Sequence, residues 1–121
     1  MSGLSILLTG EDGERLRAAL MIAMTRRAME GSARIFLHME AVCLLAPPIA
    51  APRDADHLRA GFPPLATLLD EALGDGVTVI ACQSGLALCA MKAADLDPRI
   101  ETGGLLSFMA AIGPADRLLS L

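Results

Sequence analysis

Cys82 is the residue of this sequence whose side-chain type and sequence context best suit it to take part in a reaction. It follows the uncharged run Val77–Ala81 (VTVIA) and is itself followed by Gln83, Ser84 and Gly85. A cysteine acts as a nucleophile through its thiolate, which the free backbone N–H groups and positive dipole end of a helix N-terminus stabilise. Cysteine is also among the most often buried residue types, so a packing role for Cys82 is the alternative.

The two other cysteines, Cys43 and Cys89, are predicted to be packing residues. Cys89 comes seven residues after Cys82, and two helical turns would separate the pair by roughly 10 Å, too far for an undistorted disulfide. Three cysteines are an odd number, and without an export signal they favour reduced thiols over a disulfide framework. There is no Cys-x-x-Cys motif, and neither histidine lies at ligand spacing from a cysteine, so no metal site is predicted.

Three further residues are candidates for acid/base chemistry or for a pocket near Cys82. His38 and Glu40 directly follow a predicted strand, and they reach the same sheet edge as Cys82 if all strands are parallel. His57 lies in the proline-rich loop Ala46–Pro64, which could bring it over the site. Solvated loop positions are the alternative interpretation of all three residues.

The elements that must position these residues alternate between short strands and helices. Strands are predicted over Leu4–Leu8, Arg34–Leu37, Val77–Ala81 and Arg117–Leu121. Apolar residues at helical spacing predict helices from Asp12 to Gly31, from Pro64 to Gly74, from Gly85 to Met91 and, in a shorter form, through Leu106 to Ile112. The loop 46–64 has room for one short helix. This order is typical of an α/β protein with a mostly parallel sheet.

Four residues are expected to begin or end these helices. Asp12 is a good N-cap for the first helix, and Gly31 suits the left-handed residue at its end. Ser84 can cap the helix that follows Cys82, and Gly74 stops the helix before the Val77–Ala81 strand. Cys82 is thereby expected between the carboxyl end of a central strand and the start of a helix, where ligands and catalytic groups collect in open parallel sheets.

Composition narrows the class of protein further. The 121 residues are expected to form one domain over 1–121, and 54% are apolar while only 2% are aromatic. Such an apolar small domain is expected to bury part of its surface in a subunit interface. The net charge of -4 without a basic cluster argues against a nucleic-acid partner. No uncharged run reaches the ~20 residues of a membrane span, and no signal peptide is evident, so a cytoplasmic location is expected.

The sequence resembles the DsrE/DsrF-like family of sulfur-relay proteins, which includes TusD-like subunits of a tRNA-thiolation relay. The resemblance covers nearly the whole chain, through ILLTGEDGERLRAALMIAMTRRAMEG, IFLHMEAV, GVTVIACQSG and GGLLSFMAAIGPADRLLSL. The strand ending in a cysteine, the Gly-Gly-x-x-x-Phe segment and the terminal Ala-Asp-Arg-aliphatic strand carry it in combination. The segment Lys92–Thr102 is shorter than in TusD, which leaves open whether the same relay partners dock.

This resemblance implies a fold, an assembly and a reaction. The fold is a flavodoxin-like, DsrE-like three-layer sandwich with about five strands, assembled as homo-oligomeric trimers or hexamers. Cys82 would carry sulfur as a persulfide between donor and acceptor proteins, with no cofactor and no metal. Backbone N–H groups at Gln83, Ser84 and Gly85 could stabilise the anionic sulfur.

Two other functions remain open from the residues alone. The protein could be an oligomeric module that binds a small ligand at the strand ends, with Cys82 merely lining the pocket. It could also be a thiol redox protein that uses Cys82, although Cys89 is poorly placed to resolve an oxidised sulfur.

Overall fold

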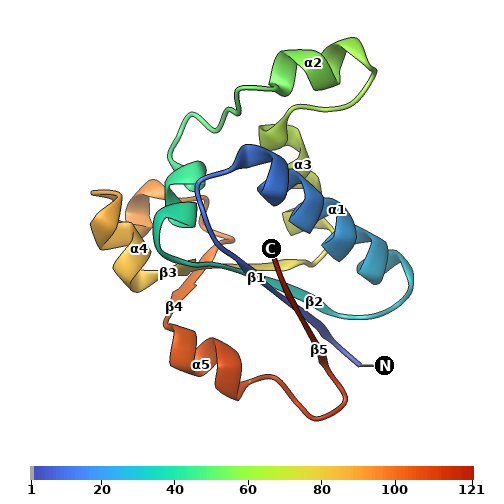
Figure 1. Cartoon of the computed structure of the whole chain (residues 1–121), viewed down its shortest axis with the longest axis vertical. Helices are drawn as coiled ribbons and strands as arrows, with labels where there is room; N and C mark the ends of the chain where they lie inside the picture. Colours follow the sequence, from blue (N-terminus) through green and yellow to red (C-terminus); the bar gives the residue numbers. More distant parts are fainter. Residues whose placement is uncertain (1) are drawn as a thin grey trace.

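The computed structural model describes residues 2–121, so the first residue of the expected 1–121 domain lies outside the described residues. Its helices and strands follow one another in the order drawn in Figure 1. The elements are β1 (Leu4–Leu8), α1 (Gly13–Ala28), β2 (Ala33–Leu37), the 3-10 helix η1 (Met39–Leu45), α2 (Asp54–Arg59), α3 (Leu65–Gly74), β3 (Thr78–Cys82), α4 (Gln83–Leu88), the 3-10 helix η2 (Ala93–Asp95), β4 (Glu101–Gly103), α5 (Leu105–Ala110) and β5 (Arg117–Ser120).

The strands form one five-stranded sheet in the order β4-β3-β2-β1-β5, and every pair of neighbours is parallel. The predicted α/β class with a parallel sheet is therefore confirmed, and the four predicted strands are all present. The fifth strand, β4, was not among the predicted ranges, because three residues after a proline-containing turn carry no alternation of apolar and polar residues.

Helices cover both faces of the sheet, as expected for three layers. In Figure 1, α1 and α3 lie above the sheet and α5 lies below it. Alternate residues of the three central strands are fully buried on the face of α1 and α3: Ile6, Leu8, Ile35, Leu37, Val79 and Ala81. The opposite face is less completely covered, since α5 is only six residues long.

Several predicted helix ends are confirmed and others are corrected. Asp12 is the N-cap of α1, and its side chain accepts a hydrogen bond from the Glu14 backbone N–H at 2.9 Å. The left-handed residue after α1 is Glu30, with φ 65°, and not the predicted Gly31. A Cβ on Gly31 would lie 2.5 Å from Nε of Arg26, so the glycine lets this arginine side chain pass close to the backbone.

The third helix also ends differently from the prediction. Gly74 is the last residue of α3 and does not stop the helix before it. The left-handed turn falls two residues later, at Gly76 with φ 89°. This turn leads the chain directly into the strand that ends at Cys82.

The predicted loop 46–64 contains the short helix α2, as expected. Asp54 fixes it: its carboxylate accepts hydrogen bonds from the backbone N–H groups of Ala51 and Leu65 and from the Arg17 guanidinium, all at 3.0 Å. Burial alone would raise the pKa of Asp54, but these bonds outweigh it and hold the pKa below its usual value. The η1 helix before this loop was not predicted. The chain turns into it at Met39, where φ is 50°.

Candidate functional site

Cys82 occupies the joint between β3 and α4. The β-branched run before it forms the central strand, and Cys82 itself keeps an extended backbone (φ -63°, ψ 128°) as the N-cap of α4. The thiol is free and the residue is only 5% exposed. Its strand register places it beside Gly103 of β4. The predicted strand-to-helix setting is thus present, with the sulfur under cover.

The predicted cap of this helix is wrong. α4 begins at Gln83, one residue before Ser84, and no side chain caps it. Gln83 and Ser84 are both exposed in its first turn. The N–H groups of a helix's first turn have no partner within the helix. They therefore remain available next to the Cys82 position.

Gly85 is buried, whereas Gln83 and Ser84 before it are exposed, and packing requires a glycine at this position. A Cβ on Gly85 would approach the Met39 backbone O to 2.4 Å and Cγ2 of Val42 to 2.5 Å. Only glycine lets α4 lie this close to η1. The sequence predicts a role only for the N–H group of Gly85, because its contact with η1 depends on the pairing of two helices that no local pattern indicates.

His38 lies at the same sheet edge as Cys82, as predicted. Leu37 and Ala81 are register partners on the neighbouring strands β2 and β3. The next residues, His38 and Cys82, therefore end adjacent strands spaced about 4.8 Å apart and share a face of the sheet. The His38 backbone N–H donates to Leu8 O at 2.9 Å. Its Nδ1 is buried and has no hydrogen-bond partner among the described residues.

The two other candidates lie elsewhere. Glu40 is exposed in the first turn of η1. His57 is on α2, where its Nε2 lies 2.9 Å from a carboxylate oxygen of Glu14 on α1. Figure 1 shows α2 and α4 at well-separated places on the molecule. His57 therefore attaches the 46–64 loop to α1 and is not brought together with Cys82.

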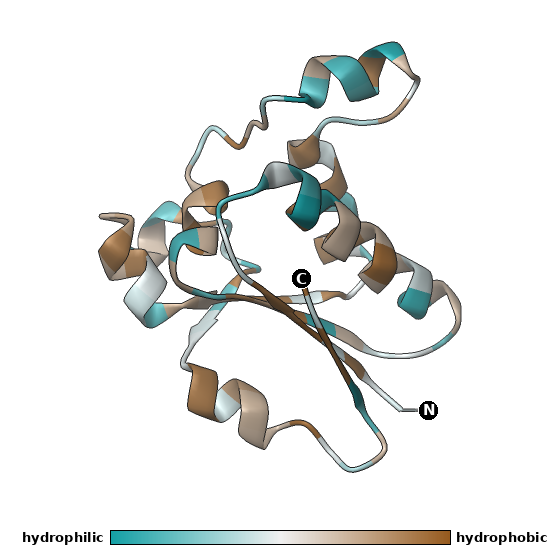
Figure 2. Ribbon diagram, viewed as in Figure 1, coloured by the Kyte–Doolittle hydropathy of each residue, from teal (hydrophilic) through white to brown (hydrophobic). Residues whose placement is uncertain are grey.

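The face of the sheet that carries Cys82 is covered by α5. Ile80, two residues before Cys82, lines a hollow of about 200 Å³ with Phe108 of α5, and strand alternation puts Cys82 on this face as well. The Phe108 ring stacks on Phe36 at 4.9 Å, and the Arg34 guanidinium lies 4.6 Å from its centre. Figure 2 shows that α5 itself is apolar or neutral along its length.

Charge pairs hold the strand beside Cys82 in place. Nη2 of Arg99, just before β4, donates to Asp97 at 2.8 Å and to Asp70 of α3 at 2.7 Å. Hydrogen bonds from the Arg99 side chain and backbone lower the pKa of Asp97 to about 2. The segment leading to Gly103 is in this way anchored to α3.

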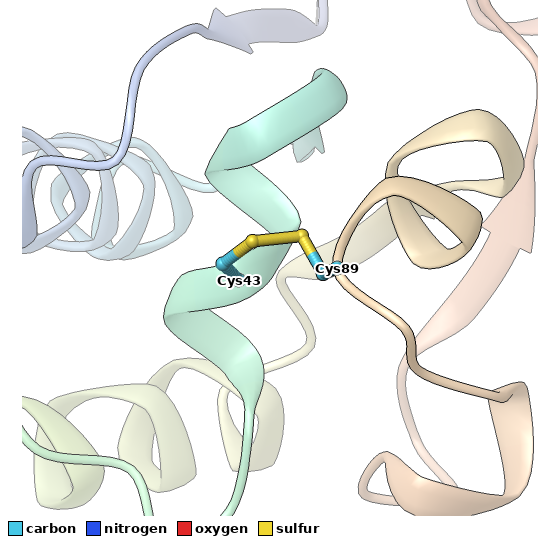
Figure 3. The surroundings of a disulfide bond; sticks show 2 residues. All are labelled: Cys43 and Cys89. Carbon is cyan, nitrogen blue, oxygen red and sulfur yellow. A yellow bond between two sulfur atoms is a disulfide. The ribbon is translucent and has the colours of Figure 1, made fainter.

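The two remaining cysteines are bonded to each other, so the prediction of reduced packing thiols is wrong for them. Cys43 on η1 and Cys89, the C-cap of α4, form a disulfide with 5.4 Å between their Cα atoms (Figure 3). Because the two cysteines are separated by 46 residues in the sequence, no local spacing pattern predicts their bond. The only available signal was that two loops after neighbouring parallel strands lie side by side.

The described residues contain neither a metal-binding cluster nor a helix suited to crossing a membrane. No group of three or more histidine, cysteine, aspartate or glutamate side chains within residues 2–121 is arranged to hold a metal ion. In the same part of the chain, no helix has both the length and the apolar character that a membrane crossing requires.

Fold and site together define an open parallel α/β protein with a covered free thiol at the carboxyl end of a central strand. The profile of the DsrE/DsrF-like family matches residues 4–121. The chain therefore belongs to the DsrE/DsrF-like family, which is associated with sulfur relay.

Two solved structures share the fold over their whole length. The ychN protein from E. coli is similar with a TM-score of 0.77 and 21% sequence identity, with 100% of both chains covered. MTH1491 from Methanobacterium thermoautotrophicum, described as a protein of unknown function, is similar with a TM-score of 0.70 and 16% identity, again with 100% of both chains covered. The search of curated proteins found no match.

Proposed function

We propose that this protein is a sulfur carrier, or a sulfurtransferase-like protein, that holds sulfane sulfur as a persulfide on Cys82. The observation that carries the proposal is the free thiol at the end of β3, directly before an uncapped helix, in a chain of the DsrE/DsrF-like family. The cysteines other than Cys82 are tied up in a disulfide. Cys82 is therefore the thiol able to accept sulfur while that disulfide is intact.

The proposed reaction is two thiol exchanges in series. The Cys82 thiolate attacks the terminal sulfur of a donor's persulfide, the donor's S–S bond breaks, and the donor leaves as a thiolate. Cys82 then carries one additional sulfur. An acceptor's thiolate attacks this terminal sulfur, the new S–S bond breaks, and Cys82 is regenerated as a thiolate. Sulfur moves without any net oxidation of the carrier, so the steps require no cofactor.

The neighbours of Cys82 suit this reaction. Backbone N–H groups at Gln83, Ser84 and Gly85, in the first turn of α4, would stabilise the anionic sulfur in the free and the persulfide form. His38, at the end of the adjacent strand, has an unpartnered ring nitrogen that could accept the thiol proton. A pocket role for Glu40 at the start of η1 stays a prediction.

Mass spectrometry of the intact protein tests the proposal. Incubation with a persulfide donor, with the disulfide kept oxidised, should add one sulfur atom, and peptide mapping should locate it on Cys82. The matched control is Cys82→Ser, which keeps the Cys43–Cys89 disulfide and should take up no sulfur. Absence of sulfur on Cys82 under reducing and oxidising conditions alike would contradict the proposal.

Sulfur donor and acceptor proteins are the partners that this function requires, and we expect it to act in the cytoplasm, where free thiols are kept reduced. We also expect a homo-oligomer, a trimer or a hexamer. Large apolar side chains are exposed on α5 and the neighbouring edge strand β5: Leu105, Leu106, Met109 and Leu118. Leu106, at 83% exposure, is the most open of them. Light scattering during size-exclusion chromatography would measure the mass of the assembly.

A further inference from the structure

The burial of Cys82 raises a question of access. A thiol that exchanges sulfur with another molecule must be reached by a second sulfur in line with the bond that breaks. At 5% exposure the Cys82 residue is nearly closed off. Some part of its cover must therefore move before the proposed transfer can take place.

The segment that follows Cys82 along the chain is weakly held. Between residues 83 and 95, only Gly85 and Leu86 are buried. Its outward side chains are exposed, including Leu88 at the end of α4. With so few buried apolar contacts, a segment opens locally at low cost unless something else fixes it.

The Cys43–Cys89 disulfide is what fixes it. Cys82 and Cys89 are the two caps of α4, so the bond holds the end of the helix opposite to the candidate site. Figure 3 shows the bond running directly from η1 to the end of α4. The close contact of Gly85 with η1 is the second attachment, and it is not covalent.

The disulfide is open to attack on one side. Neither cysteine is buried. Cys43 lines a pocket of about 510 Å³ together with Glu11, Leu44, Pro52 and Arg53. Cys89 instead packs against the hydrophobic core. Of the two cysteines, Cys43 is therefore the one that a thiol in this pocket would approach.

We propose that the Cys43–Cys89 disulfide is a thiol-reducible latch that keeps Cys82 covered, and that a dithiol reductant opens it by attack at Cys43. The reductant's thiolate bonds to Sγ of Cys43, the Cys43–Cys89 bond breaks, and Cys89 leaves as a thiolate that takes up a proton. The reductant's second thiolate then displaces Cys43, also as a thiolate. Two electrons pass to the protein, and the reductant leaves as its own disulfide.

Opening the latch frees the C-terminal end of α4. The helix is then held only by noncovalent contacts, among them those of Gly85, Leu86 and Cys89, so local opening exposes the sulfur of Cys82 more often. That this exposure regulates sulfur transfer rests on the proposed function. The opening itself does not, since it is a property of the fold.

Alkylation of Cys82 measures the opening without any sulfur chemistry. We expect iodoacetamide to modify Cys82 roughly tenfold faster in protein reduced with dithiothreitol than in oxidised protein, since each opening is less costly. Peptide mapping separates Cys82 from the other two thiols. The Cys43→Ser/Cys89→Ser variant should react at the fast rate with or without reductant, and reoxidised wild-type protein should return to the slow rate. Equal rates in oxidised and reduced wild-type protein would overturn the latch.

A monothiol probe tests the direction of attack. Glutathione cannot resolve a mixed disulfide intramolecularly, so brief treatment should place it on Cys43, provided that acid stops the exchange before the freed Cys89 thiolate expels it again. Glutathione found on Cys89 would overturn attack from the pocket. Faster alkylation without any uptake of sulfur would refute the proposed function and leave the latch standing. Uptake of sulfur on Cys82, together with equal alkylation rates in the oxidised and the reduced protein, would refute the latch and leave the proposed function standing.

Discussion

Gly85→Ala should destabilise the protein although alanine favours helices. The added Cβ would lie 2.4 Å from the Met39 backbone O and 2.5 Å from Cγ2 of Val42, whereas ordinary contacts begin at 3.4 Å. A backbone oxygen cannot move aside alone, so α4 and η1 must separate by about 1 Å. Overpacking of this kind costs about 1–3 kcal/mol, which outweighs the up to ~1 kcal/mol that alanine gains over glycine in a helix. We expect a net loss of about 1–2 kcal/mol.

Urea unfolding of the oxidised protein measures this loss, and Gly74→Ala is the matched control. A Cβ on Gly74, at the end of α3, meets nothing within 4 Å. This variant should be unchanged or more stable by up to ~1 kcal/mol. The Gly85 variant should also show faster alkylation of Cys82, because α4 no longer seats on η1. Equal stability of the two variants would refute the reasoning that Gly85 is a contact residue.

Two further predictions concern the loop and the covered face. The pKa of Asp54 is lower in the folded than in the unfolded protein, so its stabilisation is full above about pH 4 and is lost as pH falls through the folded value. Hydrogen exchange of residues 46–64, corrected for intrinsic rates, should therefore rise in acid, and Asp54→Asn, which weakens the bond to Arg17, should show fast exchange already at neutral pH. Phe108→Ala removes a 2% exposed ring stacked on Phe36 and should cost about 3–5 kcal/mol in urea unfolding, against under ~1.5 kcal/mol for Phe108→Leu. A similar cost for both substitutions would contradict the role assigned to this ring.

The parallel sheet could be predicted because its strands are apolar runs bounded by turn residues. Val77–Ala81 is the clearest case, since a strand buried on both faces must be apolar without alternation. The strand β4 could not be predicted in this way. It is held by its register with β3 and by the ion pairs of Arg99, which are tertiary contacts that no local pattern encodes.

The position of the candidate site in the fold was predicted from the sequence, but the disulfide and the helix η1 beside it were not. The order strand, Cys82, helix fixed the place of the thiol, and the parallel arrangement correctly put His38 at the same edge. The Cys43–Cys89 disulfide was not predicted, because the odd number of cysteines without an export signal favoured reduced thiols and because helix spacing excluded only the Cys82–Cys89 pair. The true partner comes from η1, a helix that begins at the left-handed Met39 and has no periodic pattern.

The two faces of the sheet differ in how completely helices cover them. The face under α1 and α3 is fully buried. The other face carries Cys82 and has only the six-residue α5 as cover, with Leu106 and Leu118 left exposed beside it. Part of the surplus of apolar surface inferred from composition therefore lies on the same side of the sheet as the Cys82 thiol. Under the proposed function, a subunit or partner that docks on α5 and β5 would shield a persulfide on Cys82 from water, because the exposed apolar side chains Leu106 and Leu118 lie on the face of the sheet that carries Cys82.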